Sequence, residues 1–173
     1  MFGNSNQDKG RKMSFLRKLF RGKKNYLVLD SLESFIIDDE TSDVVRLLEA
    51  QPRLLRQTNA KGLSALHIAA MTRKPVMISI LLQHGADPNI RTSRDYHFSL
   101  TGDVIPLGST ALHFAALQPG WTGNIPLTVQ VARTLINNGA STNIRNKKDD
   151  TPLAIAEAME CSQMCEFLRR RGD

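Results

Sequence analysis

Short apolar blocks at helical spacing alternate along the chain with loops that contain glycine and proline. The clearest block lies between Pro75 and Gly85, where Val76, Met77, Ile80 and Leu81 recur with the period of a helix. Proline fits the first position of a helix, and glycine readily adopts the left-handed conformation that ends one. The pattern predicts a helix here, a similar one between Pro126 and Gly139, and a third that ends before Gly172.

A nine-residue pattern precedes these helices and returns along the chain. Residues 62–70 read GLSALHIAA, residues 108–116 read GSTALHFAA, and residues 149–157 read DDTPLAIAE, which is a weaker copy. Ser64 and Leu81 are 17 residues apart, as are Thr151 and Leu168, and a glycine follows at 21 residues in both copies. The unit closes at about 33 residues, which is the period of a stacked helical repeat.

These motifs resemble ankyrin repeats. The resemblance rests on G-x-[ST]-A-L-H-x-A-A followed by L-L-x-x-G-A-[DS]-x-N at the right offset, and it covers roughly residues 30–173. It implies an all-α fold, an ankyrin-repeat solenoid of about four helix-turn-helix repeats with short β-hairpin fingers. Ser64, Thr110 and Thr151 stand where first helices begin, and we expect their hydroxyls to cap them. The resemblance also implies that His67 and His113 bond to backbone groups between repeats.

The sequence divides into a basic N-terminal tail, residues 1–27, and the repeat array, residues 28–173. The repeats are predicted at approximately 30–58, 60–91, 106–145 and 147–173, and the first is degenerate. In the last repeat Ala154 replaces the histidine, while Glu157 and Arg169 replace apolar residues. Terminal repeats need a polar outer face, so these replacements predict a capping repeat.

Two insertions break the period. The first, approximately residues 92–106, enlarges one finger, and the second, approximately residues 118–125, separates the two helices of one repeat. The enlarged finger is either a binding element or a segment that folds back on its own array. Because loop-closure entropy grows only logarithmically with length, we expect its removal to leave stability nearly unchanged.

Alignment of the repeats predicts which side chains face the concave surface, where ankyrin proteins usually bind partners. The enlarged finger adds an aromatic cluster, and aromatic residues dominate interaction hot spots. The predicted protein-binding residues are Lys61, Leu63, Met71, Thr72, Tyr96, His97, Phe98, Ser109, Leu117, Gln118, Lys147, Lys148 and Asp150.

Positive charge is concentrated in the tail. The formal net charge is +6, and residues 1–24 hold eight Lys and Arg against one Asp, which gives +7 there and −1 for the other 149 residues. Apolar residues at helical spacing accompany these cations. A membrane-surface helix, a nuclear-import signal, a short mitochondrial presequence and an extension that packs on the first repeat are all open interpretations. The residues concerned are Lys12, Phe15, Leu16, Arg17, Lys18, Leu19, Phe20, Arg21, Lys23 and Lys24.

Other classes of function have little support in the sequence. The repeats lack the basic stripe that nucleic-acid binding requires. The longest apolar run of the tail region, residues 26–29, is too short for a secretory signal, and no stretch approaches the length of a spanning helix. Cys161 and Cys165 are expected to be buried core thiols in a reducing compartment, since a zinc site needs four ligands. We expect no metal, no cofactor and no small-molecule substrate.

Ser64, His67 and Asp87 have the residue types of a catalytic triad, but each of them is expected at its position as part of the repeat motif. The sequence therefore predicts a non-catalytic, cytoplasmic protein–protein interaction module that binds another protein through the concave surface and the enlarged finger. One alternative is a membrane-surface-tethered adaptor that uses the basic N-terminal helix. Another is an inhibitor or decoy resembling inhibitor-of-NF-κB ankyrin arrays, which rests on fold analogy alone.

Overall fold

The computed structural model describes residues 25–97, 104–117 and 125–171, and over these residues the α-helices form four helix-turn-helix pairs. A short 3-10 helix, η1 (Pro52–Arg56), follows the first pair. The pairs are α2 (Asn25–Ile37) with α3 (Thr41–Ala50), α4 (Ala65–Met71) with α5 (Pro75–Gln83), α6 (Ala111–Ala116) with α7 (Ile125–Asn137), and α8 (Pro152–Ala158) with α9 (Ser162–Arg169).

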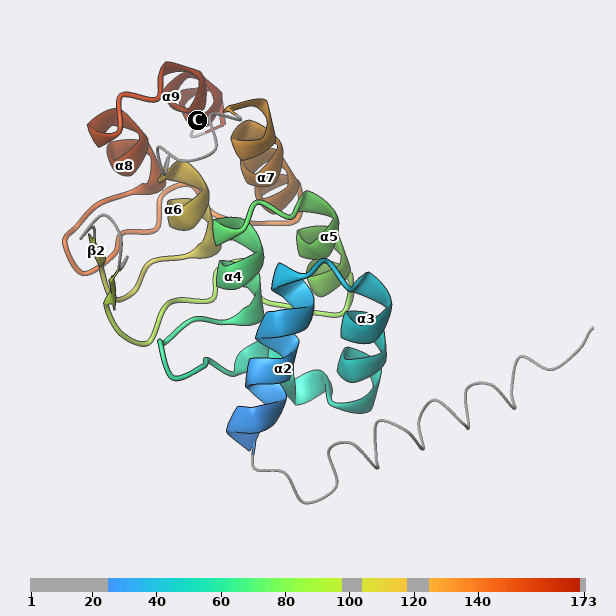
Figure 1. The fold of residues 1–173 in the computed structure, drawn as a ribbon. Coiled ribbons are helices and arrows are strands. Elements are labelled where there is room, and N and C mark those ends of the chain that lie inside the picture. The colour runs from blue at the N-terminus through green and yellow to red at the C-terminus, as the bar shows by residue number, and fades with distance from the viewer. Residues whose placement is uncertain (1–24, 98–103, 118–124, 172–173) are drawn as a thin grey trace, which may run out of the picture.

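The four pairs stack in chain order into two layers. The first helices α2, α4, α6 and α8 each contact the next, and so do the second helices α3, α5, α7 and α9. Figure 1 shows the stack running from the blue first pair to the red last pair, with the long loops between pairs projecting to one side. The predicted all-α solenoid of four helix-turn-helix repeats is confirmed.

Hydroxyl side chains stand at the start of three first helices. Ser64 Oγ accepts the N–H of His67 over 3.4 Å, and Thr151 Oγ1 accepts the N–H of Ala154 over 3.2 Å. Each bond satisfies one of the donors that a helix N-terminus leaves without an intrahelical acceptor. Thr110 occupies the same position before α6. The local sequence thus fixes where the inner layer of helices begins.

Residues in the left-handed conformation end the helices. Gly85 and Gly139, with φ of 91° and 92°, follow α5 and α7. The tight turns inside three pairs use the same conformation but place Asp39, Arg73 and Glu160 there, with φ of 64°, 55° and 53°. This conformation costs a residue with a side chain about 1–2 kcal/mol, so these three turns are strained.

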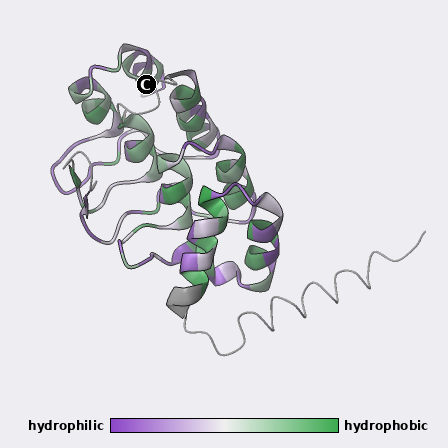
Figure 2. Ribbon diagram, viewed as in Figure 1, coloured by the Kyte–Doolittle hydropathy of each residue, from purple (hydrophilic) through white to green (hydrophobic). Residues whose placement is uncertain are grey.

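The core runs through the whole stack between the two layers. Figure 2 shows hydrophobic residues gathered on the helices and hydrophilic ones along the projecting loops. Two alanine pairs in the first helices are no more than 3% exposed: Ala69, Ala70, Ala115 and Ala116. Small side chains keep these helices thin, so neighbouring repeats approach closely, and the second helices fill the space behind them with larger apolar side chains.

The last repeat ends in a charged surface. The polar replacements Glu157 and Arg169 are both exposed and form an ion pair over 2.7 Å, and Arg170 pairs with Glu166 over 2.5 Å. Exposed pairs of this kind contribute at most about 1 kcal/mol to stability. Their main effect is to make the outer face of the last described repeat polar.

Two details of the structure add to the prediction. The helix α2 already begins at Asn25, so the predicted boundary between residues 27 and 28 falls inside a helix. In the described ranges the only strands are β1 (Tyr96–His97) and β2 (Val104–Ile105), which pair antiparallel with Tyr96 opposite Ile105. A hairpin therefore forms where the insertion lengthens a finger. None of the helices described is long and apolar enough to cross a membrane.

Candidate protein-interaction surface

Buried histidines connect one repeat to the next. His67 Nδ1 accepts the backbone N–H of Ser64 over 3.0 Å, and His67 Nε2 lies 3.1 Å from the carbonyl oxygen of Ser109 in the following finger. His113 makes the same two contacts one repeat later, over 3.0 and 3.1 Å. In both rings one nitrogen accepts while the other donates, which is the hydrogen bonding of neutral imidazole. These are the inter-repeat contacts that the resemblance implies, and they fix the spacing of the fingers.

Burial keeps both imidazoles uncharged at neutral pH. The side chains of His67 and His113 are 0% exposed, and desolvation lowers the pKa of each from 6.5 to about 4. Hydrogen bonds to the carbonyl groups of Ser109 and Asp150 act in the opposite direction but offset only part of this effect. The bridges therefore depend on the neutral form of each ring.

The serine and histidine of this unit have the spacing of a nucleophile and its base. Ser64 Oγ lies 2.8 Å from His67 Nδ1, but Ser64 is only 1% exposed. The other ring nitrogen faces the Ser109 carbonyl, and Asp87 accepts the N–H of Asn89 over 2.8 Å. The pair is a capping box at the start of α4, and its hydroxyl is buried.

Most of the predicted protein-binding residues that the structure describes are accessible. The exposed ones are Lys61, His97, Lys147 and Lys148, and the half-buried ones are Met71, Thr72, Tyr96, Leu117 and Asp150. Phe98 and Gln118 lie outside the described residues. The accessible residues come from the first helices and the fingers, so they share the side of the stack that these elements form.

The prediction that Leu63 and Ser109 lie at the surface is wrong. They are 1% and 0% exposed, and Leu63 belongs to the apolar core. The Ser109 hydroxyl donates to the carbonyl oxygen of Pro106 over 2.7 Å, and its N–H donates to Thr92 Oγ1 over 3.1 Å. Both residues directly precede a helix cap, where the chain turns into the stack. At the open end of the stack Asp150 occupies this position and remains half-buried.

The base of the enlarged finger folds back on the array. The ring of Tyr96 lies 6.2 Å from the ring of Phe114 on α6, and Ile105 is only 1% exposed. Asp95 Oδ1 accepts the N–H of Leu107 over 2.7 Å and closes the base of the finger. The finger was interpreted either as a binding element or as a segment that folds back on the array, and the second interpretation describes its base. Residues 98–103, at its tip, lie outside the described residues.

Packing at the base changes what removal of the insertion would do. Residues 92–106 include Thr92 and Ile105, which are 2% and 1% exposed. Their loss would remove buried apolar surface and the Thr92 hydrogen bonds to Pro106 and Ser109. We therefore expect the deletion to lower stability, whereas the entropy of an open loop alone predicts almost no change.

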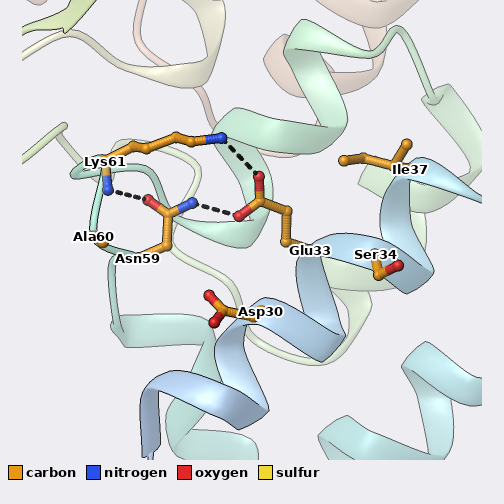
Figure 3. A pocket seen from close by; sticks show the side chains of 7 residues that line it. All are labelled: Asp30, Glu33, Ser34, Ile37, Asn59, Ala60 and Lys61. Carbon is orange, nitrogen blue, oxygen red and sulfur yellow. Dashed lines mark hydrogen bonds and ion pairs between the residues drawn. The ribbon is translucent and has the colours of Figure 1, made fainter.

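A pocket of about 310 Å³ with several charged side chains in its lining lies between α2 and the first finger. Asn59 Nδ2 donates to Glu33 Oε2 over 2.7 Å, and Lys61 Nζ lies 3.5 Å from Glu33 Oε1. Figure 3 shows Glu33 reaching from α2 to both residues, with Asp30 and Ile37 on the same helix. The pocket thus combines two carboxylates, one ammonium group and an apolar side chain.

This pocket was not among the sites predicted from the sequence, although the sequence contains a signal for it. Leu32 and Glu33 align with the Leu-His pairs at residues 66–67 and 112–113. In the first repeat a carboxylate therefore replaces the bridging imidazole and reaches the following finger through Asn59 and Lys61. The first repeat is degenerate in sequence but keeps a bridge of different chemistry.

An apolar groove of about 370 Å³ lies between the enlarged finger and the last repeat. It is walled by Val104 and Ile105 of β2, Leu117 after α6, and Ile155 and Met159 of the last repeat. The last finger adds Lys148 and Asp150 to its lining. Sequence reasoning found Leu117 and the two finger residues, but it did not place β2 beside α8.

The two cysteines are free thiols. Cys161 and Cys165 are 3% and 7% exposed, and burial raises the pKa of the Cys165 thiol. Within the described ranges no three His, Cys, Asp or Glu side chains gather in a way that could hold a metal ion. All predicted tail residues between positions 12 and 24 lie outside the described residues, as does Gly172.

Comparison with known proteins agrees with this architecture. Residues 35–143 match the family model "Ankyrin repeats (3 copies)". The human B-cell lymphoma 3 protein is 30% identical over 125 residues, 60% of this chain, and the mouse ankyrin repeat and SOCS box protein 16 is 32% identical over 107 residues, 62% of this chain. A putative ankyrin repeat protein, FPV222, of fowlpox virus (strain NVSL) is 29% identical over 144 residues, 75% of this chain.

The matched regions are small parts of these relatives, 26%, 21% and 19% of their respective lengths. The family-model match lies within the repeat array. The family model covers well over half of the 173 residues. The chain belongs to the ankyrin-repeat family.

Proposed function

We propose that this chain is a non-catalytic module that binds another protein through the face formed by its first helices and fingers. Ankyrin repeats are protein–protein interaction modules. The observation that carries the proposal is the accessible row of side chains on three successive fingers, represented by Lys61, His97 and Lys147. Bridges between repeats hold these fingers at fixed spacing, so the face is preorganised for a partner.

The absence of catalysis is part of the proposal. In the described residues two hydroxyl–imidazole pairs, Ser64 with His67 and Thr110 with His113, are buried and form the capping boxes of α4 and α6. Each histidine orients toward a backbone carbonyl, whereas a catalytic base is usually oriented by a carboxylate. A small-molecule substrate is likewise not part of the proposed function, and neither is nucleic acid, because the array carries a net charge of −1.

A capture experiment with matched variants tests this proposal. The full chain and the triple variant Lys61→Ala, His97→Ala, Lys147→Ala are used to capture proteins that are then identified by mass spectrometry. The control is Glu49→Ala, Gln83→Ala, Gln130→Ala, which truncates three exposed residues of the second-helix layer. We expect the control to retain the captured proteins and the finger variant to lose them. Equal capture by both variants would place the binding face elsewhere.

The charge of the tail supports a second candidate, an adaptor held at a membrane surface. Eight basic residues near an anionic leaflet contribute about 1 kcal/mol each, and apolar side chains beside them add a second signal. The test is sedimentation of the full chain with anionic and with neutral vesicles. Replacement of Lys18, Arg21, Lys23 and Lys24 by Gln should abolish cosedimentation with anionic vesicles. Unchanged sedimentation would exclude the adaptor.

We place the protein in the cytoplasm as part of the proposal, because both cysteines are unpaired and two buried free thiols fit a reducing compartment. Membrane association and nuclear import through the basic tail are the alternatives to this location. The inhibitor or decoy interpretation rests on fold analogy, and no contact in the described residues favours it.

A further inference from the structure

One wall of the apolar groove beside the last repeat is formed by residues of the first insertion. In the fingers before α4 and α8 an asparagine lies five residues before the helix cap, and its Oδ1 accepts two backbone N–H groups. Asn59 accepts those of Lys61 and Leu63. Asn146 accepts those of Lys148 and Asp150. The equivalent residue of the enlarged finger is Ile105. A polar turn is thereby replaced by the apolar strand β2, in which Val104 remains 37% exposed.

The opposite wall is open because the last repeat carries small side chains. Ala154 occupies the place that His67 and His113 hold in the earlier repeats, three residues after the cap. Ala158, seven residues after the cap, takes the place of the larger Met71 and Leu117. Ile155 and Met159 then form an apolar lining behind the two alanines.

The rim of the groove carries a cation that makes no ion pair in the part of the chain described. Lys148 is exposed, whereas the neighbouring Arg145 pairs with Asp149 over 2.9 Å. Asp150 lines the same groove but is half-buried, so Lys148 is the more exposed of the two charges. An incoming negative group thus meets Lys148 as the accessible charge of the rim.

The size of the groove limits what can enter it. A volume of about 370 Å³ is close to the lower end of the range of roughly 300–1,000 Å³ that is typical of ligand pockets. It suits one bulky side chain with its adjoining backbone, and it is too small to seat a helix along its length. An aliphatic lining with one cation at the edge favours an apolar anchor with a carboxylate nearby.

We propose that this groove anchors an extended segment of a partner protein that inserts one bulky apolar side chain between β2 and α8 and pairs a carboxylate, within two residues of it, with Lys148. This inference deepens the proposed function and rests on it. It assigns to the insertion a role that follows from its packing: the base of the finger forms a wall of the binding site.

A display library of random twelve-residue peptides provides the test. The library is selected on the full chain, and the affinities of the selected peptides are measured by fluorescence anisotropy. Ala158→Arg fills the groove from an exposed helix position, and Lys148→Glu reverses the charge of the rim. Gln163→Arg is the matched control, because it adds the same charge at an exposed position of α9 outside the groove. Circular dichroism and melting temperature confirm that each variant is folded.

We expect the selected peptides to share a bulky apolar residue with Asp or Glu within two positions. Ala158→Arg should weaken their binding at least about tenfold, as loss of an anchor does, and Lys148→Glu should weaken it up to about fivefold. Gln163→Arg should leave it unchanged. In peptides whose acidic residue is replaced by lysine, Lys148→Glu should restore part of the affinity.

Three results would overturn the inference: no peptide is enriched, the enriched peptides lack the apolar–acidic pair, or they bind the Ala158→Arg variant as tightly as the original chain. Each differs from failure of the proposed function, because the finger variant Lys61→Ala, His97→Ala, Lys147→Ala leaves the groove lining intact. If that variant loses captured proteins while Ala158→Arg has no effect, the module binds proteins but not through this groove.

Discussion

Mild acid should destabilise this protein through His67 and His113. Each ring is completely buried, and its pKa falls from 6.5 to about 4 in the folded protein. Between these two values the unfolded chain binds more protons than the folded one, so stability falls as the pH falls. The stabilisation is fully present above pH 6.5 and is lost as the pH approaches 4.

The size of the effect follows from the two pKa values. At pH 5 each ring costs about 2 kcal/mol of unfolding free energy relative to neutral pH, and the two rings together cost about 4 kcal/mol. Near pH 5.5 the free energy of unfolding should change by about 2.4 kcal/mol per pH unit, and by half of that when one histidine is removed. This is a large share of the 5–15 kcal/mol that is typical of a domain.

Urea denaturation at intervals from pH 5 to pH 7.5 measures this slope. His113→Gln and His67→Gln should lower stability at every pH. This constant loss does not change how steeply the free energy of unfolding varies with pH, so the slopes of the variants and the original chain can be compared directly. Each single variant should show about half the slope of the original chain, and the double variant almost none. A flat profile in the original chain, or a full slope in either single variant, would refute the reasoning.

Three other substitutions test packing and backbone strain by urea or thermal denaturation. Leu112→Ala should lower the free energy of unfolding by about 2–5 kcal/mol, because Leu112 is 0% exposed, and a loss well below 1 kcal/mol would contradict its place in the core. Ile105→Ala should cost a similar amount, whereas a negligible cost would mean that the finger behaves as an open loop. Glu160→Gly should raise stability by about 0.5–1 kcal/mol, since it relieves a φ of 53° at the expense of a more flexible unfolded chain. An unchanged or lower melting temperature would argue against strain in that turn.

The repeats could be predicted from the sequence because their determinants are local. A cap residue such as Ser64, a proline at the start of α5 and Gly85 after it act within a few residues of their own position. The period of the motif then fixes how the units stack, since each repeat contacts only its neighbours. The fold class therefore follows from the sequence.

The proposed binding face was less predictable because its shape depends on contacts between distant residues. The ring contact of Tyr96 with Phe114, and the position of β2 beside α8, join segments that no local pattern relates. Leu63 and Ser109 were misplaced because alignment identifies equivalent positions but not the direction in which a side chain turns. Glu33 is the opposite case. The alignment places it at the position of the bridging histidines, but a carboxylate in place of an imidazole concealed that it makes an equivalent bridge.

The junctions between repeats differ in the solution condition that weakens them. The first is held by the charged side chain of Glu33 on Asn59 and Lys61, and screening by salt weakens the Lys61–Glu33 ion pair. The next two are held by neutral imidazoles, which salt does not screen but acid protonates. Because a linear stack can unfold one repeat at a time, the solution condition determines which repeat unfolds first. High salt weakens the contact of the N-terminal repeat, and low pH weakens the contacts between the repeats that follow it.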